Sequence, residues 1–445
     1  MPTAVAGPGP DQAGPAHPAP AHPAPERPAP AHPASERPAP GRAASERPAA
    51  ELDVEALRAD TPATGQLVYL DNAGAALPPR PVVDAVLRHI RREAEIGGYR
   101  AEAEAAEAIT GTYQAIGQLL NCGTDEVALM ESATAGWQQA FHAIRFRPGD
   151  RILTTRSEYA SNFISYLQVS RRYEASVEVV PDDEHGQLDV AALADLLDDR
   201  VRLISITHVP TNGGLVNPAA AVGRLAREAG VCYLLDACQS VGQLPVDVAE
   251  IGCDMLTVTG RKYLRGPRGS GALYVRRDRL DELEPPFLDL TSASWTGPTD
   301  YQLRPDARRF ENFESGVAAR VGLGVAVRYT LAVGVPAAWE RIHSLAAGLR
   351  DRLGAVPGLT VRDKGLVRGG IVSFDLAGVP ATEVRDRLRT RGVTVAVSLA
   401  GSTLLDMRDR DLSAVVRASV HYYNTDTDLD RATAAIAELA AARAG

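Results

Sequence analysis

Lysine is almost absent from this chain of 445 residues. Of its 47 basic residues only Lys262 and Lys364 are lysines, and the rest are arginines. Chemistry that requires a primary amine on a side chain therefore has at most two candidates. The 56 acidic residues outnumber the basic ones and leave a net charge of −9. This balance argues against a nucleic-acid partner that is bound through net positive charge.

Cysteine and long apolar runs are also scarce. The four cysteines are Cys122, Cys232, Cys238 and Cys253, and their spacing contains no CxxC pair. This argues against a disulfide scaffold and a structural metal site, and it favours a reducing, cytoplasmic location. No apolar run reaches the roughly 18 residues that a membrane-spanning helix needs, and the first ten residues do not resemble a signal peptide. We therefore expect a cytoplasmic protein with no metal and no membrane partner.

The first fifty residues differ from the rest of the chain. They hold 14 of the 31 prolines and no Leu, Ile, Phe, Tyr or Trp. Such a segment cannot bury enough apolar surface to offset the entropy lost on ordering. We expect residues 1–60 to form a disordered tail, with a partner-binding arm as the alternative.

The middle of the chain alternates short strands with helices. The runs 203–206 and 232–235 are almost continuously apolar, which is typical of strands that are covered on both faces in a parallel sheet. The expected strands are Glu126–Met130, Arg151–Thr155, Ser176–Val180, Val201–Val209, Val231–Asp236 and Asp254–Thr259. The expected helices between them lie near Ala133–Ile144, Ser161–Arg172, Asp189–Leu197 and Pro218–Ala229.

Longer helices flank this α/β region. Val82–Ile96 and Ala101–Leu120 are each expected to form one helix, and a long helical stretch follows Gly316 as far as about Ala355. A smaller strand–helix–strand–helix set comes last, at Gly370–Leu376, Ala381–Arg391, Val415–Tyr423 and Asp426–Ala442. We expect an α/β fold with a large domain (61–330) built on a mostly parallel sheet, and a smaller α+β domain (331–445).

Polar residues follow several of the predicted strands. Ligands of open α/β sheets bind beyond the carboxyl ends of the strands, so these residues should meet at one edge. They include Asp236, Lys262 and the small residues Ala133 and Thr134 at a helix start that can bind an anion. Pyridoxal 5′-phosphate needs this combination: an amine for its aldehyde, a carboxylate for its ring nitrogen, and N–H and hydroxyl donors for its phosphate.

The same residues resemble a known family, the class V aminotransferases among the fold-type I pyridoxal-phosphate enzymes. This family includes cysteine desulfurases, isopenicillin-epimerase-like proteins and C–S lyases. The similarity runs from about Val68 to about Ala440. It is carried by six blocks: Tyr69–Ala73, Ser157–Asn162, His208–Gly213, Leu235–Ser240, Thr259–Lys262, and Val416–Ser419 with Tyr423–Thr425.

The resemblance implies roles for individual residues. Lys262 would bind the aldehyde of the cofactor, Asp236 would pair with its ring nitrogen, and Tyr159 would stack on the ring where desulfurases have a histidine. The further residues implied for the cofactor are Ala133, Thr134, Thr211, Asn212, Gln239, Thr259 and Arg261, and those implied for the substrate are Asn72, Ala73 and Arg417. Either Thr211 or Asn212 could contact the cofactor. The family also implies a homodimer.

One loop departs from the desulfurase pattern. Segment Ser398–Leu412, where a desulfurase keeps its nucleophilic cysteine, contains no thiol, and Cys253 is the last cysteine of the chain. We expect Cys238 to point away from the ring, so that no protein-bound persulfide forms. The expected reaction is β-elimination from a cysteine conjugate, that is, a C–S lyase of sulfur or specialised metabolism. The alternatives are an aminotransferase, epimerase or decarboxylating deaminase, or a non-catalytic interaction protein on the same fold.

Overall fold

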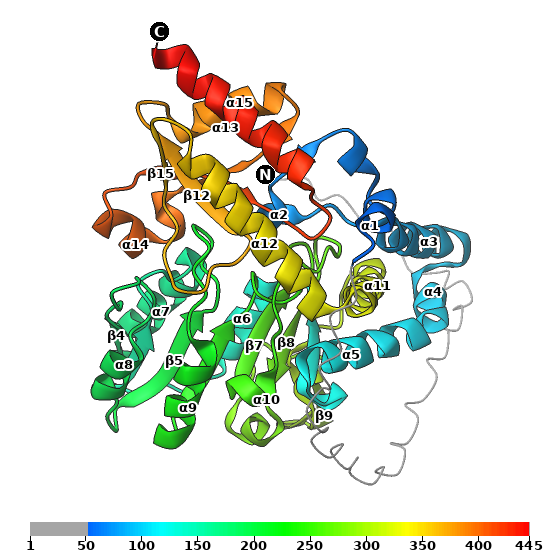
Figure 1. The fold of residues 1–445 in the computed structure, drawn as a ribbon. Coiled ribbons are helices and arrows are strands. Elements are labelled where there is room, and N and C mark those ends of the chain that lie inside the picture. The colour runs from blue at the N-terminus through cyan, green and yellow to red at the C-terminus, as the bar shows by residue number, and fades with distance from the viewer. Residues whose placement is uncertain (1–51, 445) are drawn as a thin grey trace, which may run out of the picture. The chain divides into compact units, whose positions relative to one another are not determined.

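A mixed sheet of seven strands lies at the centre of the computed structural model, which describes residues 52–444 (Figure 1). Its order is β2-β8-β7-β6-β5-β3-β4, and only β8 runs antiparallel to its neighbours. The strands are β2 (Val127–Met130), β3 (Arg151–Thr154), β4 (Ser176–Val179), β5 (Val201–Thr207), β6 (Cys232–Asp236), β7 (Met255–Thr259) and β8 (Gly271–Val275). All six predicted strands are present, whereas β8 was not predicted.

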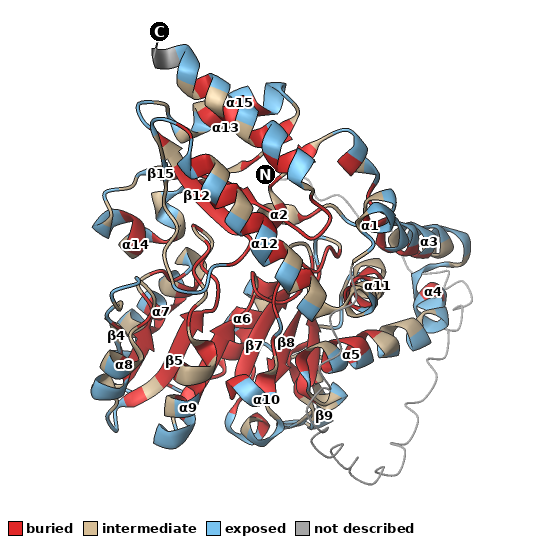
Figure 2. Cartoon of the chain, viewed as in Figure 1, coloured by how far each residue is buried: buried red, intermediate tan, exposed pale blue. Residues whose placement is uncertain are grey.

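Helices cover both faces of this sheet, as the apolar strands require. Neighbouring residues of β6 belong to different cores: Leu234 packs in the cluster that contains Trp137 of α6, and Leu235 packs in the cluster that contains Val222 of α9. Buried strands between two layers of helices are visible in Figure 2. The helices that follow the first strands are α6 (Ala133–His142), α7 (Ala160–Tyr173), α8 (Val190–Leu196), α9 (Ala219–Ala229) and α10 (Val248–Ile251).

A second, antiparallel sheet is built from the C-terminal part of the chain. Its strands in order are β11 (Leu359–Val361), β12 (Ile371–Leu376), β15 (Ala414–Ser419) and β14 (Ala396–Leu399), with helices α13 (Ala381–Thr390), α14 (Leu404–Asp409) and α15 (Asp426–Ala444). Strand β15 ends at Ser419, so the strand predicted as far as Tyr423 was too long. With the seven-stranded sheet, this confirms the predicted α/β fold with a mostly parallel main sheet.

The N-terminal part of the described chain packs against this second sheet. Strand β1 (Val68–Tyr69) pairs in parallel with β13 (Val393–Thr394), and Asp71 forms a bridge with Ser419. Both sheets belong to one unit, Ala49–Gly445, and the division near residue 330 stays a prediction. The pairing of β1 matters for the site because it carries Asp71 to the end of β15.

Two predicted boundaries need correction. Residues Val54–Ala59 of the predicted tail form helix α1, which buries Leu57, so the tail ends before residue 60; its first 51 residues lie outside the described part. The helix predicted at Ala101–Leu120 is instead two helices. The elements not yet given are α2 (Asn72–Ala75), α3 (Arg80–Ile96), α4 (Gly98–Glu104), α5 (Ala106–Leu120), β9 (Ala293–Gly297), β10 (Asp300–Leu303), α11 (Val317–Val333) and α12 (Val335–Gly354).

The long helical stretch after Gly316 bends at one glycine. Helices α11 and α12 meet at Gly334, whose φ of 86° suits a residue without a Cβ atom, and their axes differ by 79°. Within residues 52–444 no single helix is long and apolar enough to cross a membrane, although this bent pair passes by combined length and composition.

Candidate active site

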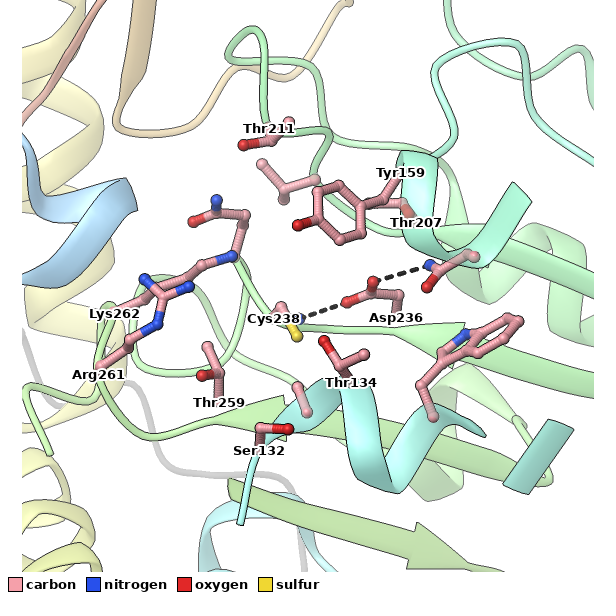
Figure 3. Close-up of a pocket in the computed structure, with 15 residues that line it drawn as sticks. Ser132, Thr134, Tyr159, Thr207, Thr211, Asp236, Cys238, Thr259, Arg261 and Lys262 are labelled. Atoms are coloured by element: carbon pink, nitrogen blue, oxygen red, sulfur yellow. Dashed lines mark hydrogen bonds between the residues drawn. The ribbon is translucent and has the colours of Figure 1, made fainter. Parts of the chain in front are cut away.

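A pocket opens where the carboxyl ends of β5, β6 and β7 meet the N-terminus of α6 (Figure 3). Its space, counted to the open mouth, is about 610 Å³. The edge of the sheet therefore gathers the polar residues as expected from a parallel α/β architecture. The predicted site residues that line it are Ala133, Thr134, Tyr159, Thr211, Asp236, Gln239, Thr259, Arg261 and Lys262.

Asp236 is the last residue of β6 and is buried, with 6% of its surface exposed. Its Oδ2 accepts a hydrogen bond from Asn162 Nδ2 at 3.0 Å, and its Oδ1 accepts one from the backbone N–H of Cys238 at 3.0 Å. No Arg, Lys or His within residues 52–444 forms an ion pair with it. A buried carboxylate without a cation is costly, so the pocket offers a place for a positively charged group of a ligand.

Lys262 lies in the turn after β7, and Figure 3 shows it entering the pocket beside Arg261. Burial lowers the pKa of its ammonium group, and Arg261 and Arg417 lower it further, against the opposing effect of Cys238 and Asp236. In the described part of the chain its Nζ has neither a hydrogen bond nor an ion pair. This amine is therefore available to a ligand.

The other lysine is fully engaged elsewhere. Lys364 Nζ lies 2.9 Å from Asp182 and 2.8 Å from Asp406, which places it in an ion-pair cluster away from the pocket-lining residues. Of the two amines in the chain, only the one on Lys262 lines the pocket.

The start of α6 forms one end of the pocket. Ser132 caps the helix by accepting a hydrogen bond from Ala135 N–H at 3.1 Å, while Ala133 and Thr134 keep their N–H groups free of described backbone partners. Strand β8 approaches closely here because residue 271 is glycine: a Cβ atom would lie 3.0 Å from Ala133 N. The serine cap thus leaves the predicted anion site at this helix start intact.

Further donors surround this helix start. Thr259 and Arg261 line the same pocket as Thr134. The guanidinium of Arg261 also donates to the carbonyl oxygen of Gly74, which fixes it at the edge of the pocket. Hydroxyl groups, a guanidinium and the N–H groups of a helix start are together suited to a phosphate group.

Gln239 leaves one polar atom without a partner. Its Nε2 donates to the carbonyl oxygen of Ala73 at 3.1 Å, while its Oε1 is buried and lacks a hydrogen bond within the described residues. Buried acceptors are nearly always satisfied, so this one calls for a donor from a ligand or water. The free amine of Lys262, the uncompensated Asp236, the phosphate-type donors and this orphaned oxygen together fit pyridoxal 5′-phosphate.

Four predicted site residues do not line the pocket. Asn72 is fully buried: its Nδ2 donates to Ser419 O at 2.6 Å and its Oδ1 accepts from the hydroxyl of Tyr423. It therefore joins α2 to the end of β15 and does not line this pocket, and its role toward the substrate stays a prediction. Ala73 is buried as well and reaches the pocket only through its carbonyl bond to Gln239.

Thr211 and Asn212 have different surroundings, and which of them contacts the cofactor stays a prediction. Thr211 lines the pocket, whereas Asn212 donates through Nδ2 to Thr403 Oγ1 at 2.7 Å and is not a lining residue. Arg417 stands behind Thr211, with its Nη1 at 2.8 Å from Thr211 Oγ1 and its Nη2 at 3.1 Å from Asp71 Oδ1. Its buried Nε has no partner among the described residues.

Cys238 lies in the pocket, contrary to the prediction that it points away. It is one of the lining residues, and Figure 3 shows it beside Asp236 and Thr134. Burial and the charge of Asp236 raise the pKa of its thiol well above the usual range, so the thiol stays protonated at neutral pH. The other three cysteines do not line this pocket.

Sequence reasoning did not single out several lining residues. Asn162 and Thr207 contribute polar groups, and Trp137 contributes an apolar wall. Asn162 belongs to the block Ser157–Asn162 and Thr207 ends β5, so their position at strand ends was the available signal. The same block supplies Glu158, a buried acid just behind the pocket.

Comparison with known proteins agrees with this geometry. The family model described as aminotransferase class-V matches residues 68–432. A probable cysteine desulfurase of Xylella fastidiosa is 31% identical over 400 residues, which cover 86% of this chain and 95% of the relative. A cysteine desulfurase of Salmonella gallinarum is 30% identical over 403 residues, covering 87% and 98%.

Solved structures share the fold at lower sequence identity. The apo cysteine desulfurase of Thermococcus onnurineus superimposes with a TM-score of 0.81 at 23% identity, covering 88% of this chain and 99% of that one. The cystine C–S lyase C-DES, in complex with its product cysteine persulfide, gives a TM-score of 0.77 at 21% identity, covering 85% and 99%. The family match confirms the resemblance that the six blocks carried. This chain belongs to the class V aminotransferase family and is a pyridoxal-phosphate-dependent enzyme.

Proposed function

We propose that this enzyme cleaves the C–S bond of a cysteine conjugate by β-elimination. The balanced reaction is R–S–CH₂–CH(NH₃⁺)–COO⁻ + H₂O → R–SH + pyruvate + NH₄⁺. Support comes from relatives named as cysteine desulfurases and a cystine C–S lyase, which also act at a C–S bond. The chain's own pocket supplies the amine, the carboxylate and the anion-binding donors that such chemistry needs.

The cofactor supplies an aldehyde that condenses with amines and a ring that withdraws electrons from the substrate's Cα. Asp236 holds the ring nitrogen, because its carboxylate is buried and lacks another cation. Thr134, Thr259 and Arg261 hold the phosphate together with the N–H groups at the start of α6. Tyr159, in the turn before α7, lines the same pocket and would stack on the ring, as the family resemblance implies.

Lys262 moves the proton at Cα. Burial lowers the pKa of its amino group, which increases the neutral fraction that can accept a proton near neutral pH. Its position at the end of β7 keeps its Nζ in the same pocket as Asp236. Arg417, which stands behind the pocket-lining Thr211, binds the substrate carboxylate as the family resemblance implies, a bidentate task that suits its planar guanidinium.

The fate of the sulfur distinguishes a lyase from a desulfurase, and one observation carries our choice. The loop 398–412 lies beside the pocket, because its Thr403 accepts a hydrogen bond from Asn212, which is next to the pocket-lining Thr211. This loop contains no cysteine. Cys238 is present in the pocket, but its protonated thiol is a weak nucleophile. Sulfur therefore leaves as a free thiol.

The test is a product analysis of the loaded enzyme with a panel of cysteine conjugates. We expect equal amounts of pyruvate, ammonium and free thiol, with Lys262→Ala inactive and Lys364→Ala active. Alanine and sulfide formed from free cysteine would identify a desulfurase instead. Turnover that depends on an added 2-oxo acid would identify an aminotransferase, inversion at Cα an epimerase, and release of carbon dioxide a decarboxylating deaminase. No turnover of any amino acid would leave the interaction-protein alternative.

A further inference from the structure

Glu158 is a buried acid that the chemistry above does not use. It lies in the turn between β3 and α7, and 3% of its surface is exposed. Within residues 52–444 it has no ion pair with Arg, Lys or His. A carboxyl group that is buried without a cation must be stabilised in another way, and here its hydrogen bonds provide that stabilisation.

Every partner of Glu158 is a neutral donor. Its Oε2 accepts from Thr154 Oγ1 at 3.1 Å and from Thr207 N–H at 3.1 Å. Its Oε1 accepts from Tyr159 N–H at 2.8 Å, from Asn162 Nδ2 at 2.9 Å, and from the hydroxyl of Thr207. These donors come from β3, β5 and α7, so the carboxyl group joins three elements that end at the pocket.

Asn162 links this acid to the pocket. Its Nδ2 donates to Glu158 Oε1 at 2.9 Å and to Asp236 Oδ2 at 3.0 Å, which uses both amide hydrogens. The amide orientation is determined by this arrangement, because the reversed amide would place an oxygen against two carboxyl groups. The bond from Asn162 to Asp236 is drawn in Figure 3, and the N–H of Cys238 holds the other oxygen of Asp236.

We propose that Glu158 is a positioning residue that acts through Asn162: it holds the Asn162 amide so that the Asp236 carboxylate keeps one orientation in the pocket, and its negative charge adds to that of Asp236 near a bound cation. The proposal rests on the function proposed for Asp236 opposite the ring nitrogen. Glu158 does not line the pocket, whereas Asn162 does, so any effect of Glu158 on a ligand must pass through Asn162 and Asp236.

Burial makes the charge of Glu158 adjustable. Desolvation raises the pKa of Glu158 to about 7, and the neighbouring charge of Asp236 acts in the same direction. The charged groups that act on one another here are Glu158 and Asp236. The hydroxyl of Tyr166 lies in the same buried region but stays neutral, because burial raises its pKa well above the usual value. Loss of the negative charge at position 158 should weaken the hold of Asp236 on a bound cation.

The test compares two variants of the loaded enzyme with a control on the same helix. Glu158→Gln keeps the shape but removes the charge, and Asn162→Ala removes the link. Tyr166→Phe removes a buried hydroxyl of α7 that bonds Ser205 and touches neither carboxyl group through a hydrogen bond. The measurements are the dissociation constant of the cofactor, the pH titration of its visible absorption band, and kcat and KM.

We expect Asn162→Ala to weaken cofactor binding about tenfold, the loss of one hydrogen bond to a charged group. Glu158→Gln should move the midpoint of the absorption titration to lower pH, because a negative charge near Asp236 is gone. Both should lower kcat more than they raise KM, and Tyr166→Phe should change neither the midpoint nor the cofactor affinity. Isosteric Glu158→Gln keeps the test informative if Asn162→Ala does not fold.

Asp236→Ala separates the two levels of the argument. If Asp236→Ala loses the absorption titration while Glu158→Gln and Asn162→Ala behave like the wild type, the proposal for Glu158 is overturned and the function of Asp236 stands. If Asp236→Ala itself binds and titrates the cofactor like the wild type, the proposed function of Asp236 fails and the role of Glu158 fails with it.

Discussion

Arg417 Nη2 lies 3.1 Å from Asp71 Oδ1, so the guanidinium proposed to bind the substrate carboxylate already holds a carboxylate of the protein. The two residues are 346 positions apart and meet because β1 packs on the end of β15. Asp71 therefore occupies one side of the Arg417 guanidinium, and a substrate carboxylate must compete with Asp71 for it.

Removing the competing acid should therefore improve substrate binding. We expect Asp71→Asn to lower KM about fivefold at unchanged kcat, since a partly exposed ion pair contributes about 1 kcal/mol. Asp375→Asn is the matched control: it breaks the pair with Arg362 at a similar exposure, 28% against 26%, on β12. A higher KM in Asp71→Asn would mean that Asp71 orients Arg417 rather than competing for it.

Lys262 should be the residue that carries the cofactor. Its amine is free in the pocket, whereas Lys364 is held by Asp182 and Asp406. Purified protein should be yellow, and borohydride reduction should fix the cofactor to a peptide that contains Lys262, as read by mass spectrometry. Label on the peptide with Lys364, or no label, would contradict the assignment.

Cys238 should not be needed for turnover, although it lies in the pocket. Its pKa is raised by burial and by Asp236, so at neutral pH it holds its proton. Cys238→Ala should retain turnover within about twofold, since a surface of similar size remains. The variant that also replaces Cys122, Cys232 and Cys253 should still bind cofactor and release thiol.

A persulfide on any cysteine peptide after incubation with free cysteine, together with loss of activity in Cys238→Ala, would contradict the lyase. The comparison is made against wild-type protein at the same cofactor occupancy, so that a change in cofactor binding is not counted as a loss of turnover.

Large apolar side chains around the β9–β10 hairpin should lie in a homodimer interface. Leu290 and Trp295 are 76% and 83% exposed, and Phe287, Tyr301 and Phe313 are also more than half exposed. Such a patch on an isolated chain indicates a protein contact, and the family resemblance points to a second copy.

Leu290→Asp combined with Trp295→Asp should convert the dimer to a monomer with little activity, as measured by analytical ultracentrifugation and turnover. Leu366→Asp, at 63% exposed on another part of the chain, is the control and should leave the dimer intact. Deletion of residues 1–50 should leave assembly and activity unchanged. A fully active wild-type monomer at assay concentration would overturn the prediction.

Glu158 should make stability depend on pH. The pKa of Glu158 is raised from 4.5 to about 7 in the fold, so between these values the folded state keeps a proton that the unfolded chain releases. Stability therefore falls as pH rises from 4.5 to 7, and this contribution is constant above 7. The full effect corresponds to about 3 kcal/mol.

The free energy of unfolding in urea, measured for wild type and Glu158→Gln across this range, checks the expectation. The variant should gain stability relative to wild type as pH rises to 7, whatever constant offset the substitution adds. Parallel curves would show that Glu158 ionises normally in the fold.

Local pattern was sufficient for much of the fold and the site. The apolar runs of β5, β6 and β7 identified strands that are buried on both faces. The residues at the carboxyl ends of these strands could then be assigned to one edge of the sheet. Asp236, Thr259 and Lys262 could be placed together for that reason. Strand β8 was not predicted because it follows a glycine-rich turn and runs antiparallel to its neighbours. An alternation of helices and strands in the sequence gives no signal for such a strand.

Other features depend on contacts between distant parts of the chain. The local sequence does not distinguish Asn72 and Asn212 from asparagines that line a pocket. In the fold their side-chain amides donate to Ser419 and Thr403, which only tertiary packing brings near. The pairing of Arg417 with Asp71 has the same origin. The hydrophobic pattern of a segment reflects how it is buried. It therefore identifies the buried parallel strands, whose carboxyl ends share one edge of the sheet. Which donor finds which acceptor there is decided by segments hundreds of residues apart, and no local pattern records that choice.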